Sequence, residues 1–214
     1  MFANLVTYHL HRHTLPAQDT PASAARVAPA YQYILAGNGV LVRAETRFFT
    51  ALLLIAPGVV RGLPPLRPQF RLKVPCLPAG LLHPLLADAR GAPRPGCGLH
   101  EALYQFHHHG RTVQLKKPPQ QAGAGHVLAA GSSDPAILCE LHSHGLLPAY
   151  WSATDDADEQ GARLYAVIGR LATRPEIRLR VGVYGYWQPL PVTAAFTGRA
   201  PSPICMRRQS DDPS

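Results

Sequence analysis

The segment from residue 137 to residue 155 constrains this chain more strongly than any other part of its sequence. It runs Ile-Leu-Cys-Glu-Leu-His-Ser-His-Gly-Leu-Leu-Pro-Ala-Tyr-Trp-Ser-Ala-Thr-Asp. Up to His142, Ile, Cys and Leu alternate with Leu, Glu and His, which is the period of a β-strand. Residues two apart on a strand point to the same face, so His142 and His144 are predicted to lie side by side. The acidic run that begins at Ser152 is typical of the first turn of a helix.

Two imidazoles from a strand and one carboxylate from the following helix suit a zinc ion. Three protein ligands leave a fourth position open, which distinguishes a catalytic zinc site from a structural one. The sequence therefore predicts that His142, His144 and Asp155 bind one Zn²⁺ per chain. A simpler interpretation stays open for each half of the pattern. Ser152 and Asp155 are spaced much like a capping box, and two histidines at a strand end can be solvated.

Taken together, the two halves resemble the JAMM motif of the JAB/MPN metalloproteases. That motif has an upstream glutamate, His-Ser/Thr-His, seven residues, and then Ser-x-x-Asp. Residues 145–151 are the seven intervening residues here, and Gly145 stands where most of the family has proline. The resemblance covers residues 77–192, and the flanking sequence is similar to a bacterial branch of the family associated with PRTRC systems. It implies an α+β fold of the JAB/MPN type, with cytidine-deaminase-like layers in which helices flank a mixed β-sheet.

The resemblance also implies roles for individual residues. Glu101 falls at the start of the first core strand, where the family has the general base that moves a proton from water to the leaving amine. Ser152 falls on the serine that helps to hold the oxyanion. Glu140 is a rival base, because it lies two residues before His142. We interpret it instead as a carboxylate behind the metal ligands, which orients a ligand histidine or pairs with an arginine. A solvated strand-edge carboxylate is the alternative for Glu101.

The implied activity is that of a zinc-dependent isopeptidase or peptidase. It would hydrolyse the amide bond after the C-terminus of a ubiquitin-like modifier, with water activated by the metal as the nucleophile. The implied partners are a ubiquitin-like protein or its conjugates, and E1-like and E2-like proteins. Two alternatives remain open. One is a module of the same fold that binds the modifier without cutting it, and the other is a zinc amidase that acts on small conjugates.

Composition and charge narrow the remaining classes of partner. The formal net charge is +8, but the basic residues are scattered and follow no RNA-binding aromatic pattern, so a nucleic-acid partner is not expected. A positive field that attracts an acidic protein partner also explains the charge. The four cysteines form no Cys-x-x-Cys pair, which argues against a zinc ribbon or a redox motif. Without a signal-peptide pattern or a membrane-spanning apolar run, we expect a cytoplasmic protein and no membrane partner.

The remaining sequence predicts three regions. Residues 1–76 are expected to form a β-rich N-terminal region of unknown role, in which Gly37-Asn38-Gly39 forms a hairpin turn. Residues 77–196 are the JAB/MPN-like domain, and residues 197–214 are expected to be disordered. Further expectations are a helix from near residue 84 to residue 90, strands at 48–56, 69–74, 101–108, 111–116, 163–171 and 177–187, and a loop at 118–125.

Overall fold

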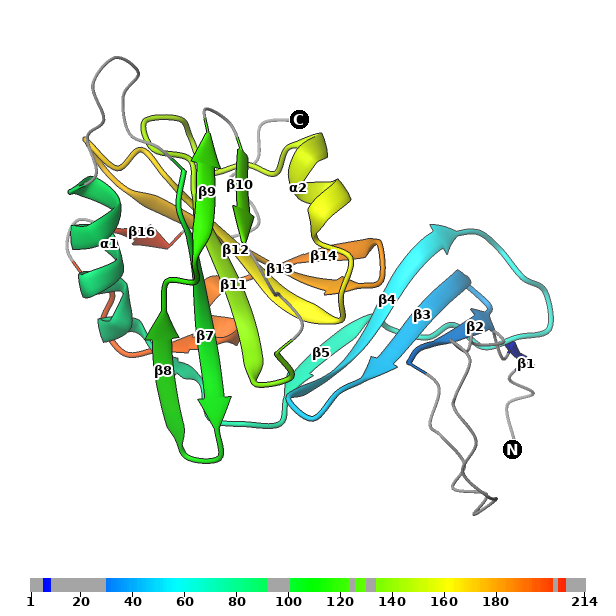
Figure 1. The fold of residues 1–214 in the computed structure, drawn as a ribbon. Helices are drawn as coiled ribbons and strands as arrows, with labels where there is room; N and C mark the ends of the chain where they lie inside the picture. Colours follow the sequence, from blue (N-terminus) through cyan, green and yellow to red (C-terminus); the bar gives the residue numbers. More distant parts are fainter. Residues whose placement is uncertain are drawn as a thin grey trace, which may run out of the picture. The chain divides into compact units, whose positions relative to one another are not determined.

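The chain divides into two compact units, residues 1–71 and residues 72–214, called here the N-terminal and C-terminal units. The computed structural model in Figure 1 describes residues 6–8, 30–91, 101–123, 126–129, 134–201 and 204–206. The division falls at residue 71, a little before the boundary expected at residue 76. In the described ranges, no helix has the length and apolar character that are needed to cross a membrane.

The N-terminal unit is a five-stranded sheet in the order β1-β2-β3-β4-β5. Its strands are β1 (Val6–Tyr8), β2 (Gln32–Ala36), β3 (Gly39–Glu45), β4 (Phe49–Pro57) and β5 (Gln69–Leu72). The four strands β1 to β4 pair antiparallel in sequence order. The hairpin expected at Gly37-Asn38-Gly39 joins β2 to β3. Apolar side chains from strands β2, β3 and β4 of this sheet form a small core of Ile34, Ala36, Leu41 and Leu52.

The C-terminal unit is built on a sheet in the order β14-β13-β12-β11-β7-β8, with β16 beside β13. Its strands are β7 (Leu103–His109), β8 (Thr112–Lys116), β11 (Ile137–Ser143), β12 (Arg163–Gly169), β13 (Glu176–Val183), β14 (Tyr186–Leu190) and β16 (Cys205–Met206). The pair β11–β12 is parallel and so is β13–β16, whereas the other pairs are antiparallel. The sheet is therefore mixed, and the described chain has the α+β character that the sequence predicts.

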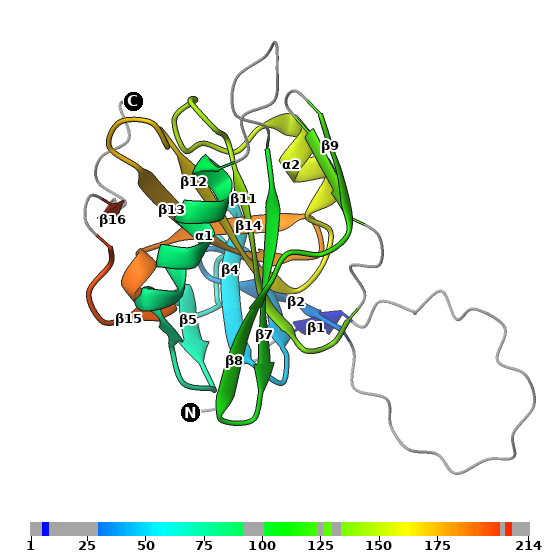
Figure 2. The same cartoon turned by 60° about the vertical axis from the view of Figure 1, so that its left-hand side comes forward.

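Among the described residues of this unit, two α-helices cover opposite faces of the sheet. Helix α1 (Leu82–Arg90) contacts the face that carries Tyr104, whose hydroxyl donates to Asp88 at 2.7 Å. Helix α2 (Ala153–Asp158) contacts Arg180, which the strand register places on the other face. Figures 1 and 2 show α1 and α2 on either side of the strands between them. The α1 face is the apolar core, since the helix buries Leu82, Leu85, Leu86 and Ala89.

Shorter elements complete the unit. Strand β6 (Leu77–Pro78) pairs in parallel with β15 (Phe196–Thr197), and β9 (Gln120–Gly123) pairs antiparallel with β10 (His126–Ala129). Two single turns of 3₁₀-helix, η1 (Ala79–Leu81) and η2 (Val192–Ala194), precede α1 and β15. Helix α1 begins two residues earlier than expected, and Pro84 still lies in its first turn, where its missing N–H has little effect.

Three expectations from the sequence differ from the structure. The loop expected at 118–125 contains strand β9. The single strand expected at 177–187 is two strands, β13 and β14, joined by a turn at Tyr184–Gly185 in which both residues have positive φ. Within the tail expected to be disordered, β16 pairs with β13, while residues 207–214 lie outside the described residues.

Candidate metal centre

Strand β11 brings two histidines to one face in the middle of the sheet. His142 pairs across to Leu103 on β7 and to Val167 on β12. His144 follows the strand, and its backbone N–H donates to the carbonyl of Ile168 at 2.8 Å. Both side chains are buried. Because β11 is paired on both sides, the two imidazoles are held on a rigid backbone.

Helix α2 brings a carboxylate to these imidazoles. Ser152 is its N-cap, and its Oγ accepts from the Asp155 N–H at 3.2 Å. In return, Oδ2 of Asp155 accepts from the Ser152 N–H at 2.6 Å, which completes a capping box. The Ser152 hydroxyl also donates to the same Oδ2 at 2.8 Å. The capping interpretation of Ser152 therefore describes this structure, and the cap itself fixes the Asp155 side chain.

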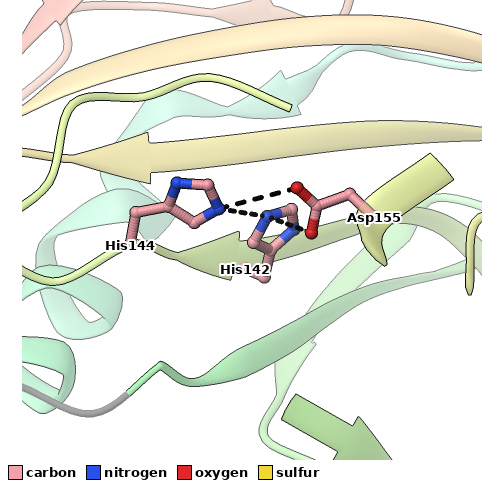
Figure 3. A group of neighbouring side chains, drawn as sticks. All are labelled: His142, His144 and Asp155. Carbon is pink, nitrogen blue, oxygen red and sulfur yellow. Dashed lines mark hydrogen bonds and ion pairs between the residues drawn. The ribbon is translucent and has the colours of Figure 1, made fainter. Parts of the chain in front are cut away.

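The three side chains form a compact group of potential ligands (Figure 3). The Nε2 atoms of His142 and His144 are 3.0 Å apart. Asp155 places Oδ1 at 3.1 Å from Nε2 of His142 and Oδ2 at 3.7 Å from Nε2 of His144. Ligand atoms about 2.0–2.1 Å from one tetrahedral zinc ion lie roughly 3.3 Å from each other. The spacing and chemistry of this group therefore fit a zinc ion.

The electrostatics of Asp155 suit a metal ligand. Its burial alone would raise the pKa of the carboxyl, but hydrogen bonds with His142 and His144 and the Ser152 N–H lower that pKa well below its ordinary value. The group is therefore ionised across the neutral range. An ionised carboxylate only accepts, so its oxygens are available to a cation.

Glu101 lies at the end of β7 that is next to the histidines. The Ser143 N–H donates to the Ala102 carbonyl at 2.9 Å, and the Ala102 N–H donates to Ser143 Oγ at 3.0 Å. Since Leu103 pairs with His142, the same antiparallel register places Glu101 opposite His144, on the imidazole face. Glu101 is partly buried and is not a member of the ligand group. This position suits a carboxylate that acts beside a metal ion.

Glu140 is bound to other groups on the same face. Its Oε2 lies 2.8 Å from Nη1 of Arg163, and its Oε1 accepts from Nε2 of Gln105 at 3.0 Å. The contacts continue along β7, where Oε1 of Gln105 lies 3.2 Å from Nε2 of His107. Of the two interactions expected for Glu140, the pair with an arginine is present.

The loop between His144 and Ser152 is fastened to the turn that follows β12. The N–H groups of Arg170 and Leu171 donate to the carbonyls of Leu147 and Gly145 at 2.7 and 2.9 Å. A third tie comes from the buried Glu176, whose Oε1 accepts from the N–H of Ala149 at 2.9 Å. These contacts define the course of the loop beside the imidazoles. The motif contains no signal for them, because the residues that hold the loop lie beyond it in the sequence.

Two glycines allow the loop between His144 and Ser152 to pass close to the end of β12. A Cβ on Gly169 would lie 2.4 Å from the backbone of Leu147 and Ala149, far inside contact distance. Gly145 has φ 55°, which proline cannot adopt. The loop therefore takes a path that the proline found in most JAMM motifs would not permit at this position.

The same loop carries exposed apolar side chains. Leu146, Leu147 and Tyr150 are 58%, 52% and 41% exposed. The ring of Tyr150 meets the His144 imidazole edge-on, with centroids 4.6 Å apart. Apolar surface therefore lies directly beside the candidate ligands.

One known protein family matches part of the chain. Residues 85–181 match the family of prokaryotic homologues of the JAB domain. The match supports the JAB/MPN family for this part of the chain, which contains every residue of the candidate centre. A search of curated proteins gave no significant match.

Proposed function

We propose that this chain, with a JAB-like segment at residues 85–181, is a zinc-dependent peptidase or isopeptidase. The observation that carries the proposal is the group formed by His142, His144 and Asp155, with ligand atoms all within 4.8 Å of one another. Two imidazoles and one ionised carboxylate are a donor set of catalytic zinc sites and leave a coordination position open. The motif provides one such set, so we expect one zinc ion per chain.

A zinc ion held by His142, His144 and Asp155 would act as a Lewis acid and would make water an effective nucleophile at neutral pH. Glu101, on the same face of the sheet, accepts a proton from the attacking water and delivers it to the leaving amine. The hydroxyl of Ser152 donates to the substrate carbonyl oxygen as negative charge develops there. Its proton points to Asp155 in this structure, so the hydroxyl must turn toward the substrate first. One such donor lowers the activation free energy by about 2.7–4 kcal/mol.

The substrate that fits the resemblance is the C-terminal tail of a ubiquitin-like modifier. In this proposal the tail binds as an extended segment along a path beside the loop at 145–151. Leu146 and Leu147 offer apolar contacts beside that path. The similarity to PRTRC-associated proteins supports the same substrate class, with E1-like and E2-like proteins as further partners.

The test combines metal content with hydrolysis. Purified wild-type protein should hold close to one zinc per chain by mass spectrometry of the metal, and the double variant His142→Ala/His144→Ala should hold none. The wild type should also cut a ubiquitin-like protein from a reporter fused to its C-terminus. Absence of metal from the wild type would refute the proposal. Binding of the fusion without cleavage would favour the non-catalytic module, and preference for small amides would favour the amidase.

The role of Glu101 has its own test. Glu101→Gln keeps the shape of the side chain but cannot accept the proton, so we expect zinc content to stay near that of the wild type while turnover falls about 10²–10⁴-fold. Glu140→Gln is the matched control, since that carboxylate pairs with Arg163, and it should keep appreciable turnover at saturating zinc. An active Glu101→Gln variant beside an inactive Glu140→Gln variant would move the base to Glu140.

A further inference from the structure

Helix α2 carries the carboxylate of the candidate centre but has no apolar anchor. It is six residues long, and none of its residues is buried. An isolated helix shorter than about 12–15 residues is marginal in water, and helices in proteins are usually held by an apolar face. The capping box shapes its first turn, yet a cap does not attach a helix to a sheet. Other contacts must therefore place Asp155 over the imidazoles.

The guanidinium of Arg180 makes those contacts. Arg180 lies on β13, between Tyr165 of β12 and Pro189 of β14. Its Nη1 donates to Oδ1 of Asp156 at 2.7 Å, and its Nε donates to Oε2 of Glu159, also at 2.7 Å. Residues three apart lie on one side of a helix. One guanidinium on the sheet therefore binds side chains at both ends of α2. The Glu159 N–H in turn donates to the Asp155 carbonyl at 2.9 Å.

Two tryptophans hold the guanidinium itself in place. Its Cζ lies 4.8 Å from the ring centroid of Trp151 and 5.0 Å from that of Trp187. Trp151 directly precedes the N-cap of α2, and Trp187 belongs to β14. Arg180 is only 5% exposed. A planar guanidinium can stack on aromatic rings while its edge donates in two directions, and an ammonium cannot do both.

We propose that Arg180 is a positioning residue that sets the metal affinity of this site without touching the ligands. It holds the segment from Trp151 to Glu159. It thereby keeps Asp155 in position as the third candidate ligand, beside His142 and His144. The inference rests on the proposed metal site. When such a supporting contact is lost, metal affinity typically falls about 10–100-fold. We expect a loss in that range here.

The test is the zinc affinity of Arg180→Lys, measured by competition with a chromophoric chelator. The variant keeps the charge but loses the stacking on the two tryptophan rings and the paired hydrogen bonds to Asp156 and Glu159. Its Kd for zinc should therefore rise about 10–100-fold. With Co²⁺ as the probe, its absorption spectrum should resemble that of Asp155→Ala rather than that of the wild type. A Kd within twofold of the wild type, with an unchanged Co²⁺ spectrum, would overturn the inference.

The matched control removes a polar tie from the other helix. Tyr104→Phe deletes the hydroxyl that donates to Asp88 of α1, on the opposite face of the sheet. It should lower the melting temperature and leave the Kd for zinc unchanged. An equal loss of zinc affinity in Tyr104→Phe would reduce the effect of Arg180 to general stability and refute the proposal.

A second variant decides the matter if Arg180→Lys does not fold. Asp156→Asn weakens one of the two bonds from Arg180 at a partly exposed position, so the protein should fold and its Kd for zinc should rise by several fold. An unchanged Kd in folded Asp156→Asn would refute the inference. If wild-type protein binds no zinc, the proposed function fails first. If wild type binds zinc and these variants bind it equally, only the role of Arg180 fails.

Discussion

Gly145 is the residue at which this chain departs most clearly from the motif it resembles. Its φ of 55° lies in the left-handed region, where a residue with a Cβ is destabilised by about 1–2 kcal/mol. We therefore expect Gly145→Ala to lower the free energy of unfolding by at least that amount, and Gly145→Pro to lower it further because the ring fixes φ near −65°. Urea denaturation followed by circular dichroism measures both.

Gly80 provides the control for that substitution. A Cβ at Gly80 meets no atom within 4 Å, and its φ is not positive. Gly80→Ala should therefore change stability little or raise it slightly by restricting the unfolded chain. If Gly145→Ala were as stable as Gly80→Ala, the left-handed conformation at residue 145 would be wrong.

The grouping of the three candidate ligands could be predicted from sequence, but the residues that support the group could not. His142, His144 and Asp155 follow from strand alternation and from the spacing of a short motif. Arg180 reaches Asp156 and Glu159 across 24 and 21 residues of sequence. Such contacts depend on strand order and register, which a local pattern does not contain. The sequence predicted that Glu140 could pair with an arginine, but only the structure identifies that arginine as Arg163.

At the scale of elements, α1 is tied to the sheet by a carboxylate that two donors share. Asp88 accepts from the Tyr104 hydroxyl at 2.7 Å and from Nζ of Lys117 at 2.6 Å. Partial burial opposes ionisation of Asp88, but these two hydrogen bonds outweigh it and lower the pKa of the carboxyl. Burial and the Asp88 carboxylate raise the pKa of Tyr104, so the hydroxyl stays a donor.

This arrangement predicts how the stability of the chain depends on pH. A carboxyl with a lowered pKa in the folded state stabilises the fold above its unfolded pKa, and the contribution is lost as the pH falls below about 4. Tyr104→Phe should thus cost about 1 kcal/mol at pH 7, a modest value because Asp88 is half exposed, and less at pH 3. Urea titrations of both proteins at the two pH values check this. An equal or larger cost at pH 3 would contradict it.

Sequence patterns predicted the elements with strong local signals and missed those without them. The motif strand and α2 were predicted from alternation and from the capping residues. The turn between β13 and β14 was missed because positive φ at two successive turn residues is usually signalled by Asn-Gly or Asp-Gly, and here the pair is Tyr184-Gly185. Strand β9 follows two prolines that favour a loop, and its pairing with β10 decides its conformation.

At the scale of the whole molecule, a metal bound only by the folded state adds to stability by mass action. Zinc at 100 times its Kd would contribute about 2.7 kcal/mol. A chelator should therefore lower the melting temperature of the wild type and leave that of His144→Ala unchanged. Differential scanning fluorimetry with and without the chelator measures the difference. Equal sensitivity in both proteins would mean that the stabilising metal lies elsewhere.

The parallel pair β6–β15 has a consequence for how the chain is made. Leu77 at the start of the C-terminal unit donates to the carbonyl of Ala195 near its far end, at 2.7 Å. A ribosome adding roughly 5–20 residues per second synthesises residue 195 some seconds after Asp155. Contacts between distant parts of a chain also slow its folding. The β6–β15 pair can therefore form only after the whole candidate ligand segment has been synthesised, and we expect it to be among the last contacts of the C-terminal unit to form.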